Sequence, residues 1–561
     1  KKARVDKTEK FTQEISVSRP VLWSVETPAL YTAVSRVIVN GIETDRQETK
    51  FGIRSIKFTK DDGFFLNGKK TPIRGVCLHH DNGYLGTAVH RRAIERQIEI
   101  MKSMGCNAIR TSHNPPDPSL LDLCDSMGML VMDEAFDEWK ENKVTYGYGR
   151  FYDEWHERDL TDMILRDRNH PSVIIWSIGN EVAEQWAGKP ADAEKRAKRL
   201  AEITRKLDPT RPLTAACNNV DDAINKGIAK HLDVFGINYS PWAYEREKGK
   251  RTLIATETAS AVSSRGVYNL VEKEGRVVID HKAGNYCSSY DDFVTEWATL
   301  ARVSLKKVGE ASWMAGEFVW TGFDYIGEPT PFWWPSVISY FGIVDLCGFP
   351  KDRYYLYKSR WTKEPMVHVL PHWNWEQFEG REIPVYVYTN CESVELFLNG
   401  QSLGEKAMKD TEKLRLEWKV KYEKGTLLAV GKNSGAEACR AERKTAGRPA
   451  RLELSADRNV ILAGNRDLSY VTARVLDENG NLCPTADNEV EFSIKGDAEI
   501  AATGNGDQKS HAFFNEKKCK AFSGILLCIV RAGEKPSDIV LKARAKGMVP
   551  AEIVIKSTAG N

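Results

Sequence analysis

The chain begins with a stretch in which polar and apolar positions alternate. Within residues 11–58 the side chains of residues 32–39 include many β-branched types, and the pair Asn40-Gly41 follows them. Alternation ending at an Asn-Gly pair predicts a short antiparallel hairpin. A complete immunoglobulin-like sandwich needs about seven strands and about 100 residues. We therefore expect residues 1–58 to supply part of such a sandwich.

The pattern changes in residues 59–362 to short apolar runs, each followed by a stretch with helical spacing. Between the first two runs, Ile94, Ile98 and Met101 recur at helical intervals. Eight strand-then-helix units with strands buried on both faces predict an α/β fold, a (β/α)8 TIM barrel. A doubly wound open sheet is the alternative, but no Gly-rich phosphate turn follows the first run. The runs span residues 71–76, 107–113, 130–135, 172–181, 212–218, 234–239, 253–260 and 314–325.

Alternation returns after residue 362. Apolar residues at every second position lead to turn signals at Asn399-Gly400 and again at Asn479-Gly480. The dipeptide Arg448-Pro449 fits a linker between two units. We predict two β-sandwich domains here, residues 363–447 and an immunoglobulin-like domain over residues 448–561.

Charge and composition narrow the class of partner. The chain has 561 residues and a net charge of +2, from 80 basic and 78 acidic side chains. This balance gives no electrostatic reason to expect nucleic acid or an anionic membrane as partner. No apolar run reaches the roughly 18 residues of a membrane span. The eleven cysteines show no C-x-x-C spacing, so we interpret Cys77, Cys106, Cys124 and Cys217 as buried apolar side chains and leave the redox compartment open.

Polar residues gather where the predicted strands end. In a (β/α)8 barrel the active site is built at the carboxyl ends of the strands, so polar side chains there are candidates for function. The candidates are His79, His80 and Asp81 after the first strand, Arg110 and His113 at the second, Asp133, Glu134, Asp137 and Glu138 at the third, Asn180 and Glu181 at the fourth, Asn238 and Tyr239 at the sixth, Glu257 at the seventh, and Trp320 and Asp324 at the eighth.

Glu181 and Glu257 each close a long apolar run. A buried ionised carboxylate costs free energy unless it is paired or used. Two carboxylates that face each other across a barrel mouth are the equipment of glycoside hydrolysis, in which one protonates the departing oxygen and the other attacks or activates water. The alternative is that one or both are structural ion pairs with arginine.

Two motifs make the hypothesis more specific. Residues 167–181 read DRNHPSVIIWSIGNE and residues 107–113 read NAIRTSH. Together with Thr256-Glu257 and the Trp320-Thr321-Gly322 segment, they resemble glycoside hydrolase family 2, the β-galactosidase and β-glucuronidase family. One position departs from that pattern, since Asn114 stands where the family usually has Tyr. The resemblance covers the barrel, and the flanking sandwiches agree with it.

The resemblance implies a role for each glutamate. Glu181 would be the general acid/base and Glu257 the nucleophile of a retaining double displacement, which requires the two carboxyl groups about 5 to 5.5 Å apart. The negative charge of Glu257 would raise the pKa of Glu181 until the glycosyl bond consumes that charge. Asn180 would bind the sugar 2-hydroxyl, and Tyr239 could donate a hydrogen bond to Glu257.

The remaining candidates would bind the terminal sugar. His79, His80, Asp81 and His113 are expected around its hydroxyls, although one of the paired histidines could instead point into the barrel. Trp320 offers an aromatic face, and Asp324 stands near it. Arg110 is expected to bind substrate or, alternatively, to fix one of the glutamates by a bidentate pair.

We expect neither an essential metal nor a cofactor. Some family members bind Mg²⁺ beside the acid/base through a Glu-x-His spacing, and the corresponding residues here are Glu138-Trp139-Lys140. A charged lysine cannot ligate a hard cation, but the Lys140 ammonium could lie where the charge of the ion would be.

The identity of the sugar is less sharply indicated. Residues 339–345 lack the Asn-x-Lys pair with which the glucuronidase branch holds a sugar carboxylate, so an uncharged sugar is favoured. FGIVDL at 341–346 and GFPKD at 348–352 resemble a β-galactosidase subgroup. We expect an exo-β-glycosidase acting on terminal non-reducing β-galactosides, with β-mannosidase, β-glucuronidase or another family activity as alternatives. A carbohydrate-binding fragment without catalysis is a further alternative, although the presence of both glutamates speaks against it.

The family normally begins with a jelly-roll domain and a complete sandwich. We therefore expect that Lys1 is not the natural start of the protein and that a jelly-roll domain is missing. Oligosaccharides or other glycosides are the expected partners, homo-oligomerisation is left open, and a periplasmic or secreted bacterial location is favoured over a cytoplasmic one.

Overall fold

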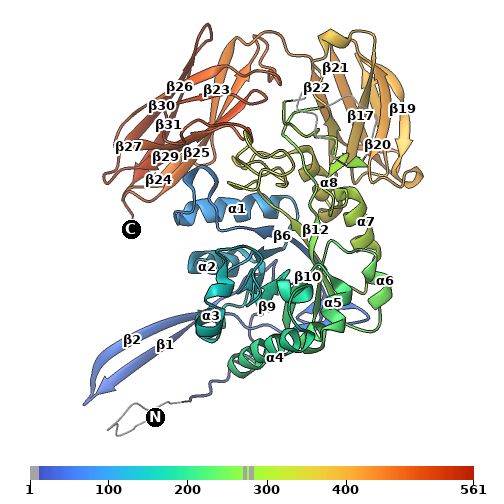
Figure 1. The fold of residues 1–561 in the computed structure, drawn as a ribbon. Coiled ribbons are helices and arrows are strands. Elements are labelled where there is room, and N and C mark those ends of the chain that lie inside the picture. The colour runs from blue at the N-terminus through green and yellow to red at the C-terminus, as the bar shows by residue number, and fades with distance from the viewer. Residues whose placement is uncertain (1–11, 269–274, 277–283, 561) are drawn as a thin grey trace.

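A closed barrel of eight parallel strands forms the centre of the molecule in the computed structural model, which describes residues 12–268, 275–276 and 284–560 (Figure 1). Each predicted apolar run overlaps one strand, and pairing of the last strand with the first closes the barrel, so the predicted fold class is confirmed. The strands are β6 (Ile73–Leu78), β7 (Ala108–Thr111), β8 (Leu130–Glu134), β9 (Val173–Asn180), β10 (Leu213–Cys217), β11 (Phe235–Asn238), β12 (Leu253–Ala259) and β15 (Gly316–Trp320).

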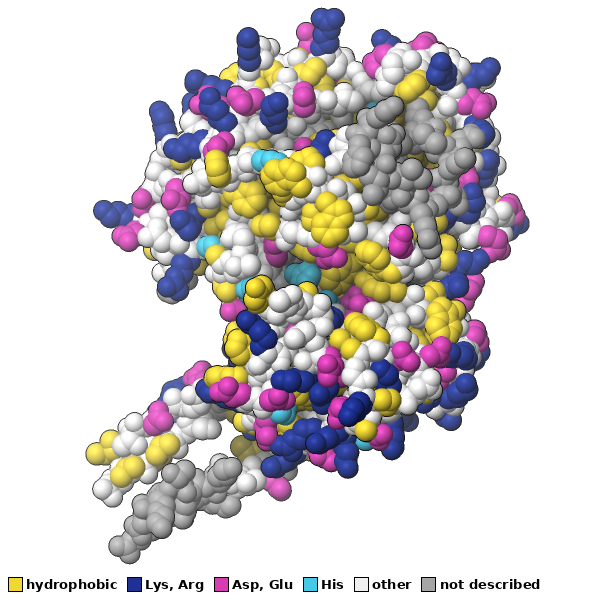
Figure 2. Space-filling model, viewed as in Figure 1, with side chains coloured by type: hydrophobic (Ala, Val, Ile, Leu, Met, Phe, Trp, Pro, Cys, Tyr) yellow, Lys and Arg dark blue, Asp and Glu magenta, His cyan; other side chains and the backbone are white. Residues whose placement is uncertain are grey.

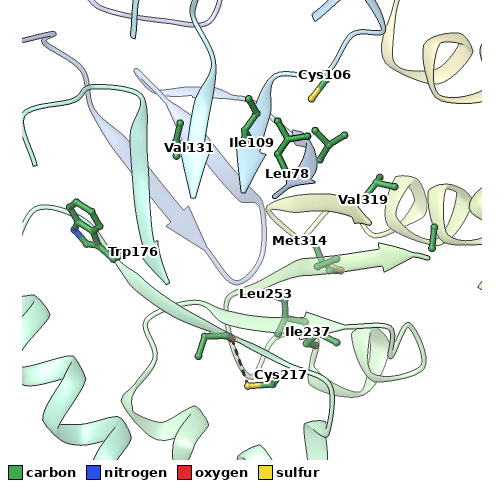
Figure 3. Packing of buried hydrophobic residues seen from close by; sticks show 14 of the residues in the cluster. Leu78, Cys106, Ile109, Val131, Trp176, Cys217, Ile237, Leu253, Met314 and Val319 are labelled. Atoms are coloured by element: carbon green, nitrogen blue, oxygen red, sulfur yellow. Dashed lines mark hydrogen bonds between the residues drawn. The ribbon is translucent and has the colours of Figure 1, made fainter. Parts of the chain in front are cut away.

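Helices surround the barrel because alternate strand residues point outward. Leu78, Ile109 and Val131 lie on neighbouring strands and belong to one buried cluster with Ile98 of the first helix (Figure 3). Side chains from the alternate positions, such as Cys77, form a second cluster. The helices are α1 (Arg91–Ser103), α2 (Pro118–Met127), α3 (Tyr152–Asp167), α4 (Pro190–Leu207), α5 (Val220–Asn225), α6 (Ala243–Glu247), α7 (Ala301–Glu310) and α8 (Asp352–Trp361).

Helix α2 shows how the sequence fixes element ends. The Asp117 side chain accepts a hydrogen bond from the backbone N–H of Ser119 at 2.8 Å and caps the first turn. Gly128 ends the helix with a φ of 70°, and a Cβ at this position would lie 2.3 Å from the Val25 carbonyl oxygen. Glycine is therefore required here both by conformation and by space.

The N-terminal part described by the structure is a long hairpin and a small sheet. The hairpin turns at Asn40-Gly41, as the alternation predicts, and extends away from the barrel with most of its residues exposed (Figure 1). Trp23, by contrast, is fully buried and donates its indole N–H to the Asp125 carbonyl. The strands are β1 (Tyr31–Val39) and β2 (Ile42–Phe51), followed by the sheet of β3 (Ile56–Thr59), β4 (Gly63–Leu66) and β5 (Lys69–Lys70).

Sheets built mainly of antiparallel strands follow the barrel in two groups. The first group pairs β16 (Val367–Leu370), β17 (Glu382–Thr389) and β20 (Leu416–Lys421) in one sheet, and β19 (Gln401–Ala407), β18 (Ser393–Leu398), β21 (Thr426–Asn433) and β22 (Ala436–Lys444) in the other. The second group has the sheet β23 (Arg451–Ala456), β25 (Leu468–Leu476), β29 (Ile525–Ala532) and β27 (Ala498–Gly504), and the sheet β24 (Val460–Leu462), β31 (Ala551–Thr558), β30 (Asp538–Ala545), β26 (Glu489–Lys495) and β28 (Lys518–Lys520). Each group encloses one buried apolar cluster, and a minor pair, β13 (Gly275–Arg276) with β14 (Phe293–Val294), precedes α7.

The last sandwich contacts the barrel through the segment after β27. Gln508 is fully buried, and its amide nitrogen donates to Asp324 at 3.2 Å and to the Ser263 carbonyl at 3.3 Å. The backbone N–H of Gly506 donates to the Tyr84 hydroxyl at 2.9 Å. These contacts fix the loops that follow β6, β12 and β15 against the C-terminal domain.

The described residues include no helix that is long and apolar enough to cross a membrane. All eleven cysteines are free, and the four that we interpret as apolar side chains are buried.

Candidate active site

A cleft of about 850 Å³ opens at the carboxyl ends of the barrel strands. Figure 2 shows a hollow in the middle of one face, with histidine and acidic side chains in it. Both predicted glutamates, Glu181 and Glu257, line the cleft. The remaining lining residues are His79, His113, Asp137, Lys143, Val144, Asn180, Asn218, Tyr239, Ser240, Ser260, Trp297, Trp320 and Glu328.

The two glutamates reach the cleft from different strands. Glu257 lies within β12 and pairs in register with Asn238 of β11. Glu181 directly follows β9, has a φ of 42°, and donates its backbone N–H to the Ala216 carbonyl of β10 at 2.8 Å. The barrel thus brings together two carboxyl groups that are 76 positions apart in the sequence.

Arg110 on β7 connects the strands beneath the cleft. Its guanidinium is fully buried and donates to Glu257 Oε1 at 2.7 Å and to Glu134 Oε2 at 2.8 Å. It also donates to Asn180 Oδ1 at 2.9 Å and to the Thr256 carbonyl at 3.0 Å. A guanidinium with no exposed surface cannot contact a sugar, so the assignment of Arg110 to substrate binding is corrected: Arg110 positions Glu257 and Asn180.

Glu257 is surrounded by donors. Besides Arg110 on Oε1, the Tyr239 hydroxyl donates a hydrogen bond to Oε2, as the sequence suggested. Charge-assisted hydrogen bonds of this kind stabilise an ionised carboxylate and fix its orientation. This surrounding suits an anionic nucleophile.

Among the residues that the structure describes, only neutral side chains donate hydrogen bonds to the Glu181 carboxyl oxygens. The side-chain amides of Asn238 and Asn218 donate to Oε1 and Oε2 at 2.8 and 3.0 Å. Burial and, next, the negative charge of Glu257 raise the pKa of Glu181 to about 7. A carboxyl group in this position keeps its proton near neutral pH and can deliver it, which suits a general acid.

An aromatic group forms one wall of the cleft. The His113 ring stacks on Trp320 at 5.4 Å between centroids, and His79 meets both rings edge-on. The Nδ1 of His113 lies 2.8 Å from Glu134. Burial and, next, the charge of Arg110 lower the pKa of His113 to about 3, and burial also lowers the pKa of His79. Both imidazoles are therefore neutral hydrogen-bonding groups at physiological pH.

Three of the predicted sugar-binding residues lie outside the cleft, which corrects their assignment. His80 is exposed, and its Nε2 lies 3.2 Å from the Thr87 carbonyl. The Asp81 carboxylate accepts hydrogen bonds from the backbone N–H groups of Gly83 and Ile326. Asp324 is buried and forms an ion pair with Lys351 at 2.7 Å. In the two aspartates the oxygen atoms already have partners, which a sugar would have to displace.

The ammonium group next to Asn180 belongs to Lys143, which the sequence interpretation missed. Its Nζ lies 2.6 Å from Asp137 and 3.1 Å from the Asn180 carbonyl. Lys140, the residue expected here, instead pairs with Asp153 at 2.6 Å. Glu138 accepts the backbone N–H groups of Lys143 and Gly149. Within the part of the chain that the structure describes, no group of three or more His, Cys, Asp or Glu could hold a metal ion.

Other cleft residues could not be found from motifs. Asn218, Trp297 and Glu328 lie on loops after β10, β12 and β15. Their only sequence signal is a position between a barrel strand and the next helix, and many residues share that signal. Which of them face the cleft depends on how the loops pack.

A (β/α)8 barrel with two carboxyl groups in contrasting surroundings at its mouth defines the class of glycoside hydrolases. The chain belongs to glycoside hydrolase family 2. Models of that family match it as "Glycosyl hydrolases family 2" over residues 1–54, as the TIM barrel domain over residues 57–325 and as C-terminal domain 5 over residues 452–554, and a domain of unknown function matches residues 380–439.

Several known proteins are similar over nearly the whole chain. Beta-galactosidase BoGH2A of Bacteroides ovatus is 45% identical over 98% of this chain and 68% of its own length. A putative beta-glucuronidase of Formosa agariphila is 36% identical over 95% of this chain, which spans 53% of that protein. The crystal structure of a beta-glycosidase from Bacteroides vulgatus superimposes with a TM-score of 0.87 at 33% identity, covering 96% of this chain and 71% of that one.

Replacing Arg110 tests its place at the centre of the site. We expect Arg110→Met to lower the free energy of unfolding by about 3 to 5 kcal/mol, because Glu134 and Glu257 would lose their buried counter-charge. Chemical denaturation followed by circular dichroism measures the change. Arg158→Met is the matched control, since the Arg158 side chain is 68% exposed, and should have little effect. Equal stability of the two variants would contradict the role of Arg110.

Proposed function

We propose that the protein is a retaining exo-β-glycosidase that removes terminal non-reducing β-galactosyl residues by double displacement. The observation that carries the proposal is the contrast between two carboxyl groups in one cleft. Cationic and hydroxyl donors hold Glu257, whereas amides are the only side-chain donors to Glu181 in the described part of the chain. The 45% identity to a protein named beta-galactosidase supports galactose as the sugar.

In the first step Glu257 attacks the anomeric carbon while Glu181 gives its proton to the glycosidic oxygen. The bond from the anomeric carbon to that oxygen breaks, an ester bond to Glu257 forms, and the leaving group departs as an alcohol. Arg110 and Tyr239 hold the attacking carboxylate in place. Both residues donate hydrogen bonds to the negative charge that Glu257 carries before the attack and loses when it becomes an ester.

In the second step Glu181 acts as a base. Once Glu257 is an uncharged ester, one of the causes that raise the pKa of Glu181 is gone, and that pKa falls. The Glu181 carboxylate then takes a proton from water, the resulting hydroxide oxygen bonds to the anomeric carbon, and the Glu257 carboxylate is released. Two inversions give retention of the β-configuration.

The cleft offers neutral hydrogen-bonding groups for the sugar. Asn180, held by Arg110 and Asp137, is assigned to the 2-hydroxyl, where a hydrogen bond strengthens as the oxocarbenium ion develops. His79 and His113 are assigned to other hydroxyls, and Trp320 to an apolar face of the ring.

The charges of the cleft favour an uncharged sugar. Among the described lining residues, Asp137, Glu257 and Glu328 bring negative charge, while Lys143 is the single lysine or arginine and already pairs with Asp137. Burial, together with the charges of Glu257 and Asp137, raises the pKa of Glu328. The carboxylate of a glucuronide would meet repulsion here, although relatives named beta-glucuronidase make that substrate the alternative to test.

Comparing three substrates tests the choice of sugar. We expect the protein to hydrolyse p-nitrophenyl β-galactoside faster than the β-mannoside or the β-glucuronide.

Removing the nucleophile tests the mechanism. Glu257→Ala should lower kcat by on the order of 10³-fold or more, because no group is left to form the ester. Azide should restore part of the p-nitrophenol release and yield the α-galactosyl azide, since it attacks from the vacated side. Glu245→Ala, at a side chain 71% exposed, is the control. Undiminished hydrolysis by Glu257→Ala would refute the assignment.

The pH profile tests the acid. Since the pKa of Glu181 is raised to about 7, activity limited by the first step should fall as the pH rises through that value, because Glu181 loses the proton it must donate. Asn238→Ala removes a hydrogen bond that favours the charged form of Glu181. The decline of activity at high pH, the basic limb of the pH profile, should therefore shift to higher pH in this variant. The readout is kcat/KM between pH 5 and 9. A limb that stays in place in Asn238→Ala and persists in Glu181→Gln would contradict the assignment.

A further inference from the structure

The exposed tryptophans are concentrated on one face of the barrel. All fifteen tryptophans lie within the described residues, and ten of them are buried or half-buried. The other five all lie on loops that connect the carboxyl end of a barrel strand to the next helix, which is the face that holds the cleft. Large apolar side chains gathered on a surface mark a binding site more often than scattered ones do. They are Trp186, Trp242, Trp297, Trp333 and Trp334, with exposed fractions of 49, 54, 46, 67 and 75%.

Trp297 is continuous with the active site. It lines the same cleft as Glu181 and Glu257, together with the exposed Val144. Its indole N–H donates to the Ser260 hydroxyl at 3.2 Å, so the edge of the ring is held while almost half of the residue remains open to solvent. A ring anchored in this way is a fixed flat surface at the cleft entrance.

Trp333 and Trp334 lie on the loop after β15, which reaches the C-terminal sandwich. Their loop also carries Glu328, which lines the cleft. The Trp334 ring stacks on His511 of that sandwich at 4.6 Å between centroids, and His511 Nε2 lies 2.7 Å from the Pro335 carbonyl. Two domains therefore hold the loop in place. Figure 2 shows hydrophobic side chains on both sides of the hollow.

We propose that Trp297, Trp333 and Trp334 form a binding surface for an oligosaccharide leaving group, with Trp297 next to the bond that is cleaved. The inference rests on the proposed function, in which the terminal sugar occupies the bottom of the cleft between the glutamates and Trp320. The sugars that follow must then pass the entrance. The C–H faces of neutral pyranose rings are apolar and flat, and they pack on aromatic rings while their hydroxyls stay in water. The physiological substrate is accordingly a chain of several neutral sugars capped by the cleaved residue.

Comparing two substrates separates this surface from the catalytic groups. One substrate is β-galactosyl fluoride, which has no sugar in its leaving group, and the other is cellotetraose capped with a β-galactosyl residue. Trp297→Ala should lower the ratio of kcat/KM for the capped oligosaccharide to kcat/KM for the fluoride about tenfold, which corresponds to about 1.4 kcal/mol. Trp297→Phe should restore part of the ratio. The matched control is Trp155→Ala, because Trp155 is half-buried on α3 and stacks with Arg158 outside the cleft; it should leave the ratio unchanged.

A direct binding measurement keeps the test independent of activity. Cellotetraose titrated into the wild-type protein should bind measurably by calorimetry and should bind more weakly to Trp297→Ala than to Trp155→Ala. An unchanged ratio in Trp297→Ala, or cellotetraose binding that is absent or insensitive to the substitution, would overturn the proposal. If neither galactoside is hydrolysed by the wild-type protein, the proposed function fails, while the calorimetric comparison still decides whether the tryptophans bind sugars.

Discussion

The site depends on one buried cation. The Arg110 guanidinium has no exposed surface and donates to groups on four other strands, including Glu134 on β8 and Glu257 on β12. A buried charge of this kind is strongly destabilising unless it is paired and fully hydrogen-bonded. The two carboxylates beside Arg110 supply that pairing, and the hydrogen bond from Arg110 holds Glu257 at the bottom of the cleft. Glu134 is held in turn by the Ser177 hydroxyl at 2.6 Å.

The same cation makes the two catalytic candidates unlike each other. It contacts Glu257 directly, whereas Glu181 has two amide partners and the negative charge of Glu257 in its surroundings. Identical side chains thus acquire contrasting surroundings, which is what an acid and a nucleophile need. Because the charge of Glu257 is one of the causes that raise the pKa of Glu181, formation of a glycosyl ester on Glu257 would itself favour the change of Glu181 from acid to base.

The barrel and the two glutamates could be predicted from the sequence because their signals are local. Strands buried on both faces leave continuous apolar runs, and a carboxylate at the end of such a run is conspicuous. The partners of a side chain are set by tertiary structure, so sequence reasoning misplaced Asp324, which pairs with Lys351 beyond a long loop. For the same reason Lys143 and Trp297 were missed. Loop residues lack the regular spacing that shows which side of a helix or strand is buried. Only the packing in the structure shows that Lys143, rather than Lys140, lies beside Asn180.

The central claim is that Glu257 becomes covalently bonded to the sugar. The most direct test is incubation with 2-deoxy-2-fluoro-β-galactosyl fluoride, whose ring fluorine slows hydrolysis of the ester and whose leaving group allows the ester to form. Mass spectrometry of the intact protein and of its peptides then locates the label. We expect one fluorosugar per chain, attached at Glu257, and none on a Glu257→Gln variant. A label on another residue, or steady turnover of β-galactosides without any covalent species, would contradict the account.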